Sequence, residues 1–559
     1  MGKAIKAEGN ATKYDGNTKD IRKFSLWNFW VCSTALKLLL IPGYFSTDFD
    51  VHRNWLAITN KLPMKDWYVE ATSQWTLDYP PFFAYFEWFL SQFVPGVVKK
   101  DGCLDIVEVG QFGMPTIIFQ RLTVIFSEIL LFVVLQIYIN KSNISEKSAN
   151  FVMASSIVLS PGFLIIDHIH FQYNGFLFAI LIASIIAVKH QNYLLCGALF
   201  TTALCFKHIF LYLAPSFFVL LLRAYVLDFS NFKFKSYIDL INIVRWSHLF
   251  KLAGVVLSIF AICFMPFISM MPQLLSRLFP FSRGLTHAYW APNFWAVYSF
   301  LDKVLTIMML KLPYVHKFIS NFIAPPLIPS SIDEIRERVA HNNVGTRGLV
   351  QDVYFVILPQ IQPKLTFMLT LFYQILAVIP VLFNPSFKRF IGSLTLCGFA
   401  SFLFGWHVHE KAIMLVIIPF SFLVTSDRRL LTPFRLVVAA GYVSLFPLLH
   451  ESQDFLIKVL YTLVWGIIYF FALRQTTKVS SSVQRRVFFF DRFAMAYIAL
   501  LAPLVITIQL LDVMKWKYAL LQKFEFAGLM VYSIYCAIGI LSSWMGLSWL
   551  YNFDEPLWL

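Results

Sequence analysis

Long apolar runs constrain this chain more than any other feature of its sequence. A helix needs about 20 mostly apolar residues to cross the hydrocarbon core of a bilayer, where it satisfies its own backbone hydrogen bonds. The candidate membrane spans are residues 24–43, 114–138, 150–167, 175–189, 192–206, 209–223, 250–270, 364–383, 390–406, 411–426, 432–449, 455–473, 490–510 and 526–550. The sequence therefore predicts an all-α integral membrane protein with about 14 transmembrane helices surrounded by membrane lipid.

Composition excludes the other broad classes. Hydrophobic residues make up 58% of the chain and charged residues 14%, whereas a soluble protein has about 25% charged residues. The formal net charge of +15 does not indicate nucleic-acid binding, because the basic residues punctuate the apolar runs instead of forming a stripe. The seven cysteines are scattered and form no CxxC motif, so the sequence indicates neither a metal site nor a disulfide framework.

Lysines and arginines in short loops predict the orientation, since such loops face the cytosol. Residues 1–23 form a basic cytosolic tail, and the basic stretch 223–251 returns to the cytosol. The loops that then face the other side are 44–113, 168–174, 271–363 and 405–411. The orientations predicted for the N-terminal and C-terminal halves of the chain agree if the apolar segment 294–311 does not span the membrane. Both termini are then cytosolic. The glycosylation sequons at Asn10 and Asn143 would also be cytosolic and unmodified.

Unusual polar residues gather in the loops of the far side. They are Asp48, Asp50, Arg53, Asp78 and Tyr79 in the first loop, His168, His170 and Gln172 in the second, Arg283, His287 and Trp290 in the third, and His407, His409, Glu410 and Lys411 in the last. One assembled site explains four such clusters more economically than four independent solvated turns. The chain then divides into the tail 1–23, a catalytic transmembrane module 24–430, and C-terminal helices with a cytosolic tail, 431–559.

The acidic residues of the first loop also have structural interpretations. Asp48 could cap a helix. Asp78 precedes Tyr79-Pro80-Pro81, and such a string ordinarily launches a helix, because proline suits the first turn. Asp48-Phe49-Asp50 is a D-x-D that can ligate a metal bound to phosphate, but three-residue matches are common by chance.

The histidine clusters have structural interpretations too. His168 and His170 do not share a helix face, so metal binding through a helix is unsupported. The cluster that ends in Glu410 and Lys411 could be a structural ion pair or snorkelling side chains. Functionally, these residue types suit transfer of a glycosyl or phosphoryl group from an anionic lipid. A carboxylate can take a proton from a sugar hydroxyl, and cations can balance the charge on a departing phosphate.

Five ordered strings resemble the endoplasmic reticulum glucosyltransferases that use dolichyl-phosphate glucose. They are STDFDVHRNW, W-T-L-DYPPFFAYFEW, DHIHFQYNG, RLFPFSRGL-HAYWAPNFWA and FLFGWHVHEKAI. The branch of that family that adds the first glucose typically reads D-[FY]-E-A-Q-R-H-W where this chain has the residues from Asp48 to Trp55, and it lacks the string from His287 to Trp295. The chain is more similar to the branch that adds the second glucose.

The resemblance implies a multi-span type C glycosyltransferase fold in the endoplasmic reticulum membrane with a lumenal active site. It implies inverting α-1,3 transfer of glucose from dolichyl phosphate β-D-glucose to Glc1Man9GlcNAc2-diphosphodolichol, with no cofactor and no metal. The family's catalytic base falls on Asp48, and the role of Asp50 stays open.

The residue chemistry and the resemblance together lead to a hypothesis for the remaining clusters. His407, His409, Glu410, Lys411 and Arg283 are expected to bind the donor, chiefly at its phosphate. His168, His170, Gln172 and His287 are expected to contact sugar or phosphate, and the possible site residues are Asp50, Arg53, Asp78, Tyr79 and Trp290.

Alternatives remain at the level of the sequence. The sister enzyme that adds the first glucose and a mannosyltransferase share the same chemistry, since glucose and mannose differ in the orientation of one hydroxyl. A transporter of sugar or lipid would place ionisable residues at mid-membrane, often in repeated halves. Here those residues lie at span ends and no repeat is visible.

Overall fold

The computed structural model is built almost wholly of helices. It describes residues 23–230, 241–279, 284–286, 290–312, 331–341, 354–478, 488–515 and 526–558, and the single positions 314, 316, 317, 329, 518 and 522. Within these residues the only extended pairings are two isolated bridges, Leu227 with Val244 and Thr286 with Val408. The all-α class predicted from the sequence is confirmed.

The N-terminal half contains the following helices, with short 3-10 and π segments labelled η: α2 (Trp27–Leu39), α3 (Thr47–Lys61), η1 (Met64–Asp66), α4 (Pro81–Ser91), α5 (Gly96–Lys100), α6 (Met114–Ser127), α7 (Ile129–Asn140), α8 (Ile144–Val158), α9 (Pro161–Phe163), η2 (Leu164–Ile169), α10 (Asn174–Lys189), α11 (Tyr193–Phe206), η3 (His208–Leu213), α12 (Ala214–Leu221), η4 (Leu222–Val226), α14 (Trp246–Phe264), η5 (Met265–Met270) and α15 (Met271–Leu278).

The C-terminal half continues with α16 (Phe294–Lys311), α18 (Ile332–His341), α19 (Pro363–Phe383), α20 (Phe387–Phe404), η6 (Glu410–Ile413), α21 (Met414–Ser421), η7 (Arg428–Leu430), α22 (Leu431–Val443), η8 (Phe446–Leu448), η9 (Ser452–Asp454), α23 (Phe455–Thr476), α24 (Phe488–Lys515), α26 (Ala527–Phe553) and α27 (Glu555–Trp558).

Among the described residues, ten helical stretches are long and apolar enough to cross a membrane. They are Met114–Asn140, Ile144–Ile169, His208–Val226, Trp246–Leu278, Pro363–Phe383, Phe387–Phe404, Arg428–Leu448, Ser452–Thr476, Arg492–Lys515 and Ala527–Phe553. The other four predicted spans correspond to shorter elements: α2, α10, α11, and η6 with α21. The multi-span architecture is therefore confirmed, whereas the count of about 14 spans stays a prediction.

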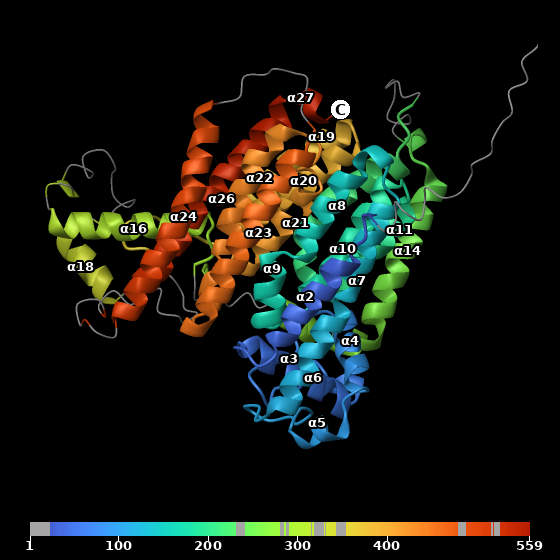
Figure 1. The fold of residues 1–559 in the computed structure, drawn as a ribbon, viewed down its shortest axis with the longest axis horizontal. Coiled ribbons are helices and arrows are strands. Elements are labelled where there is room, and N and C mark those ends of the chain that lie inside the picture. Colours follow the sequence, from blue (N-terminus) through green and yellow to red (C-terminus); the bar gives the residue numbers. More distant parts are fainter. Residues whose placement is uncertain are drawn as a thin grey trace, which may run out of the picture.

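The segment predicted not to span forms the 18-residue helix α16. It is not one of the ten long apolar stretches, and in Figure 1 it runs across the view at one edge of the molecule, whereas α24 is steeply tilted. The Asp302 carboxylate on α16 accepts hydrogen bonds from the backbone N–H groups of Val356, Ile357 and Leu358 at 2.8–3.0 Å. That contact holds the segment after α18 against the helix.

The centre of the bundle is formed by α20 and α21, which are buried along nearly their whole lengths. Lipid is as apolar as leucine, so close packing rather than water exclusion holds such helices together. At Gly398 a Cβ atom would lie 2.7 Å from the backbone oxygen of Leu415. A glycine there allows the backbones of α20 and α21 to meet.

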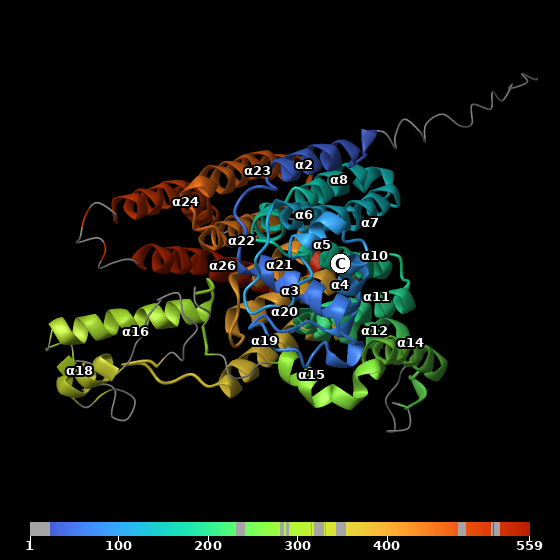
Figure 2. The ribbon, with the colours of Figure 1, turned by 90° about the horizontal axis from the view of Figure 1, so that it is seen from below.

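Helices α3, α4 and α5 cover one end of the bundle, and the C-terminal helix α27 lies at the opposite end (Figure 1). Seen from below, α3 crosses the end of the bundle in front of α20 and α21 (Figure 2). Arg121 on α6 helps to hold this end together. Its guanidinium donates to the backbone oxygens of Tyr44, at 2.7 Å, and of Ile169, at 3.0 Å, and also to that of His168. The start of α3 is thereby placed beside the end of η2.

Candidate active site

The first turn of α3 places Asp48 at the junction of several elements. Ser46 caps the helix, because its hydroxyl accepts a hydrogen bond from the backbone N–H of Asp48 at 3.1 Å. The backbone N–H and the hydroxyl of Ser46 both donate to the backbone oxygen of His170. The capping interpretation is therefore true of the neighbouring serine, and it leaves the Asp48 side chain available for other contacts.

The Asp48 carboxylate is the point where three sequence-distant clusters meet. Its Oδ2 atom accepts from Gln172 Nε2 at 2.6 Å and from Lys411 Nζ at 2.7 Å. His170 Nε2 lies 3.3 Å from the same oxygen. The side chain of Asp48 remains 24% exposed, so a substrate can reach it. The structure thus brings together the first, second and last predicted clusters.

Charge around Asp48 keeps its carboxylate ionised. Burial raises the pKa of Asp48, but the ammonium of Lys411 and the hydrogen bond from His170 outweigh burial, so the pKa lies well below its usual value. Burial, together with the same ammonium, lowers the pKa of His170. A carboxylate held ionised beside a neutral imidazole can accept a proton from a substrate hydroxyl.

Lys207 also lies at this centre, although it is not among the site residues predicted from the sequence. Its Nζ donates to Asn174 Oδ1 at 3.0 Å and lies 5.1 Å from the centroid of the Tyr79 ring. Burial lowers the pKa of Lys207 to about 8, and the nearby Lys411 acts in the same direction. The signal was present in the sequence, because the orientation count places the short turn between spans 192–206 and 209–223 on the far side.

His168 faces a different set of partners from His170. Its Nε2 atom lies 3.0 Å from Glu128 Oε2, and Lys37 forms an ion pair with the same oxygen. All three side chains are buried. Lys37 belongs to α2, Glu128 lies between α6 and α7, and His168 belongs to η2. The structure therefore does not bring His168 to Asp48, and the residue remains a predicted donor contact only.

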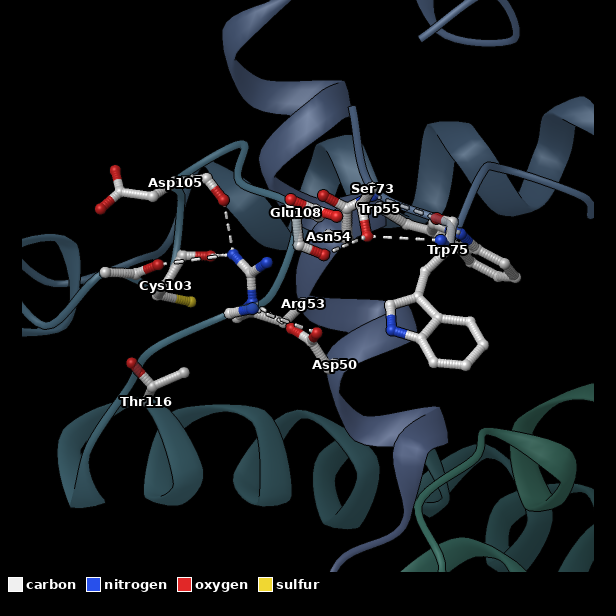
Figure 3. A network of polar contacts seen from close by, with 12 residues as sticks. Asp50, Arg53, Asn54, Trp55, Ser73, Trp75, Cys103, Asp105, Glu108 and Thr116 are labelled. Atoms are coloured by element: carbon white, nitrogen blue, oxygen red, sulfur yellow. Dashed lines mark hydrogen bonds and ion pairs between the residues drawn. The ribbon is translucent and has the colours of Figure 1, made fainter. Parts of the chain in front are cut away.

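Asp50 and Arg53 hold the loop after α5 against α3 (Figure 3). Arg53 Nε donates to Asp50 Oδ1 at 2.6 Å, and Arg53 Nη1 donates to the backbone oxygen of Asp105 at 2.6 Å. Asp50 Oδ2 accepts from the backbone N–H of Gly110 at 3.3 Å. The two carboxylates of the D-x-D motif thus have separate partners. Within the described residues, no group of three or more His, Cys, Asp or Glu side chains is arranged to hold a metal ion.

The string around Asp78 launches a helix, as its structural interpretation expects. Helix α4 begins at Pro81, and the backbone oxygen of Tyr79 accepts from the Tyr68 hydroxyl at 2.7 Å. The Tyr79 ring packs against Trp55 with 5.0 Å between ring centroids. The Asp78 carboxylate raises the pKa of Tyr79, after the larger effect of burial. Tyr79 therefore reaches the centre through its ring, beneath Lys207.

The last cluster is divided between two surroundings. His407 has a φ of 51°, and it pairs with the third loop: its backbone N–H donates to Leu285 O at 3.0 Å, and its Nδ1 lies 2.8 Å from Gly284 O. His409 Nδ1 lies 3.5 Å from Glu410 Oε2. These contacts place Lys411 beside Asp48 by fixing the turn that precedes it.

The third cluster is only partly described. Glu410 and Trp290 line a small cavity together with Pro292, Ser444, Pro447, Leu529, Tyr532 and Ser533. Lys303 Nζ lies 4.9 Å from the centroid of the Trp290 ring. Arg283 and His287 lie outside the described residues, so their predicted roles in donor binding stay predictions.

Comparisons with known proteins agree with the resemblance seen in the sequence. Residues 33–547 match the model of the ALG6, ALG8 glycosyltransferase family. The dolichyl pyrophosphate Glc1Man9GlcNAc2 alpha-1,3-glucosyltransferase of Saccharomyces cerevisiae is 74% identical over 537 residues, which cover 96% of this chain and 93% of the relative. The proteins of the same name from Candida glabrata and Kluyveromyces lactis are each 72% identical, covering 96% and 97% of this chain and 98% and 96% of the relatives.

Proposed function

This chain belongs to the ALG6, ALG8 glycosyltransferase family, and on that premise we propose that it is an α-1,3-glucosyltransferase. It transfers glucose from dolichyl phosphate β-D-glucose to Glc1Man9GlcNAc2-diphosphodolichol in the assembly of the lipid-linked oligosaccharide for protein N-glycosylation. The acceptor follows from relatives of 72–74% identity that carry this acceptor in their names. The donor, the endoplasmic reticulum membrane and the lumenal face of the reaction are part of the same proposal.

The observation that carries the mechanism is the set of contacts around Asp48. Gln172, Lys411 and His170 all approach Oδ2, so we propose Oδ1 as the proton acceptor. The hydroxyl at position 3 of the acceptor's terminal glucose gives its proton to Asp48. Its oxygen attacks the anomeric carbon of the donor glucose opposite the phosphate.

The remaining bond changes follow from this attack. The bond between the anomeric carbon and the phosphate oxygen breaks, and its electron pair leaves with dolichyl phosphate. The β linkage of the donor becomes an α linkage in the product, so the configuration is inverted. Lys411 lies close enough to Asp48 to balance negative charge on the base before transfer and on the departing phosphate during it. His407, His409 and Arg283 are proposed to complete the phosphate site.

Replacing Asp48 by asparagine tests the proposal. Asp48→Asn keeps the shape of the side chain but removes the proton acceptor, so glucosyl transfer by the purified protein should fall by at least about a thousandfold. The assay supplies labelled dolichyl phosphate glucose and the one-glucose acceptor, and the elongated glycan is measured. Asp105→Asn is the matched control, because the Asp105 side chain pairs only with Lys61 at the exposed surface among the described residues. Near-normal transfer by a folded Asp48→Asn protein would refute the assignment.

The same assay separates the alternatives. Transfer to the acceptor that carries no glucose would identify the sister activity, and use of dolichyl phosphate mannose would identify a mannosyltransferase. Movement of the lipid between leaflets of a vesicle with no elongated glycan would favour a transporter. The proposal expects the one-glucose acceptor and the glucose donor to be used together.

A further inference from the structure

A chain of hydrogen bonds leads from the buried end of α10 to Asp48. Asp167 Oδ1 accepts from the backbone N–H of Asn174 at 3.0 Å and from Asn174 Nδ2 at 2.9 Å, and Asp167 Oδ2 accepts from the backbone N–H of Gly175 at 2.6 Å. Both oxygens of Asp167 are therefore used as acceptors. The nitrogen of the Asn174 amide must face this carboxylate.

Lys207 fixes the other end of the same amide. An ammonium group donates hydrogen bonds and accepts none, and Lys207 Nζ lies 3.0 Å from Asn174 Oδ1. Asn174 is buried, with only 6% of its surface exposed, so water competes little with these contacts. With a carboxylate at its nitrogen and an ammonium at its oxygen, the Asn174 amide has one orientation that satisfies both neighbours.

This orientation passes to Gln172. Asn174 Nδ2 donates its second hydrogen to Gln172 Oε1 at 2.8 Å, and Gln172 Nε2 donates to Asp48 Oδ2 at 2.6 Å. A rotated Gln172 amide would turn its oxygen toward the carboxylate and its NH2 toward the NH2 of Asn174. Both contacts would become repulsive, so Gln172 is held as a donor to Asp48.

We propose that Asn174, held between Asp167 and Lys207, is a positioning residue that fixes the Gln172 amide and thereby leaves Oδ1 of Asp48 to receive the substrate proton. This inference rests on the proposed function of Asp48 as the base. In this arrangement Lys207 acts on Asp48 indirectly, through the side-chain amides of Asn174 and Gln172.

A double-mutant cycle tests the inference on the full-length purified protein. Gln172→Ala, Asn174→Ala and Lys207→Met should each lower kcat by roughly 10- to 100-fold, the usual effect of losing one hydrogen bond to a charged group. The KM for the donor should change little. Because Asn174 acts through Gln172, Asn174→Ala should have little further effect in the Gln172→Ala background. Lys207→Arg keeps a donor and should restore most of the activity.

The pH profile supplies a readout that a purely structural role would not move. Losing the Gln172 hydrogen bond destabilises the charged carboxylate, so the acid limb of kcat should move to higher pH in all three single variants. The other groups that face Asp48 are Lys411 from η6, His170 after η2, and Lys207 and Tyr79, and none of them is altered in Gln172→Ala or Asn174→Ala.

Several outcomes would overturn the inference. Additive losses in the double variant would show that Asn174 acts independently of Gln172. A raised donor KM for Lys207→Met that persists in the Gln172→Ala background would instead make Lys207 a phosphate contact.

If Asn174→Ala does not fold, as judged by thermal unfolding, Lys207→Met completes the cycle because it leaves α10 intact. If the wild-type protein transfers no glucose, the proposed function fails; if it does and the cycle is additive, only this inference fails.

Discussion

Asp48 presents two chemically different oxygens. Its Oδ2 atom holds an ammonium, an amide and an imidazole, and its Oδ1 atom is the one that we propose as the proton acceptor. Folding lowers the pKa of this carboxylate below its ordinary value of about 3.9. The ionised form therefore stabilises the fold at neutral pH, and this contribution is lost only as the pH falls below about 4.

Lys411→Met should shift the pH dependence of transfer. Without the ammonium, burial still raises the pKa of Asp48, and His170 is left to lower it. The pKa of Asp48 should therefore rise, and the acid limb of kcat should move to higher pH. The measurement is the rate of transfer between about pH 4 and 8, over which the wild-type base stays ionised. Lys99→Met, at an exposed lysine of α5, is the control. An unmoved acid limb would show that Lys411 does not set the charge state of Asp48.

Gly110→Ala should destabilise the loop that Arg53 holds. A Cβ atom at position 110 would lie 2.2 Å from Asp50 Oδ1 and 2.5 Å from Arg53 Nε, so the ion pair or the loop must move. The expected cost is about 1–3 kcal/mol, read as a lower midpoint of thermal unfolding. Gly96→Ala is the matched control, since nothing lies within 4 Å of its added Cβ. Equal midpoints for the two variants would contradict this explanation.

At the scale of elements, buried charge joins α2 to the helices behind it. Lys37 of α2, Glu128 between α6 and α7, and His168 of η2 form one cluster, with side chains that are 3–4% exposed. An unpaired charge among apolar helices is costly, whereas a paired one is tolerated. The short helix α2 is thus tied to the bundle by a specific contact as well as by packing.

Removing either Lys37 or Glu128 alone should lower the free energy of unfolding by more than removing both. Lys37→Met or Glu128→Gln alone should lower the free energy of unfolding by about 3–5 kcal/mol, because each leaves a buried charge without its main partner. The double variant should be more stable than the sum of the two losses predicts. Thermal unfolding in detergent measures the cycle. Lys61→Met, at the exposed pair with Asp105, should cost less than about 1 kcal/mol; additivity at the buried pair would argue against coupling.

At the scale of the whole molecule, helices α3, α4 and α5 lie at one end of the bundle and the C-terminal helix α27 lies at the other (Figure 1). The positive-inside rule predicts that the end with α3 and α4 is lumenal. The predicted site then faces the compartment where the glycan is elongated, and the C-terminal end faces the cytosol.

Glycosylation tests this orientation. Glu70→Asn, followed by the natural Ala71 and Thr72, creates a sequon in the loop between η1 and α4, which we expect to be lumenal. That variant should gain one glycan, seen as a gel shift removed by endoglycosidase. The natural sequon at Asn143, where α8 begins, should remain unmodified and serves as the internal control. A glycan at Asn143 would reverse the predicted orientation.

The sequence also predicted more of the fold than of the site. Apolar runs and loop charges are local properties, so they identified the membrane class, and they predict which loops lie on the far side and that segment 294–311 does not span. Hydropathy does not fix the count of spans, since several helices, such as α2 with its 13 residues, are shorter than a bilayer crossing requires. Where helices are short, burial against neighbours rather than length decides their place, and that is not visible in hydropathy.

By itself, the sequence determined the membrane class and the family, and it predicts Asp48 as the base, because these depend on composition and on ordered strings. Only the tertiary structure decided which polar residues meet. It turned His170 toward Asp48 and His168 toward Glu128, through the π-helical turn of η2. It brought Lys411 to Asp48 across 363 positions of sequence and placed Lys207 beside them. The direction of a side chain depends on how helices pack, and packing is a property of the whole bundle.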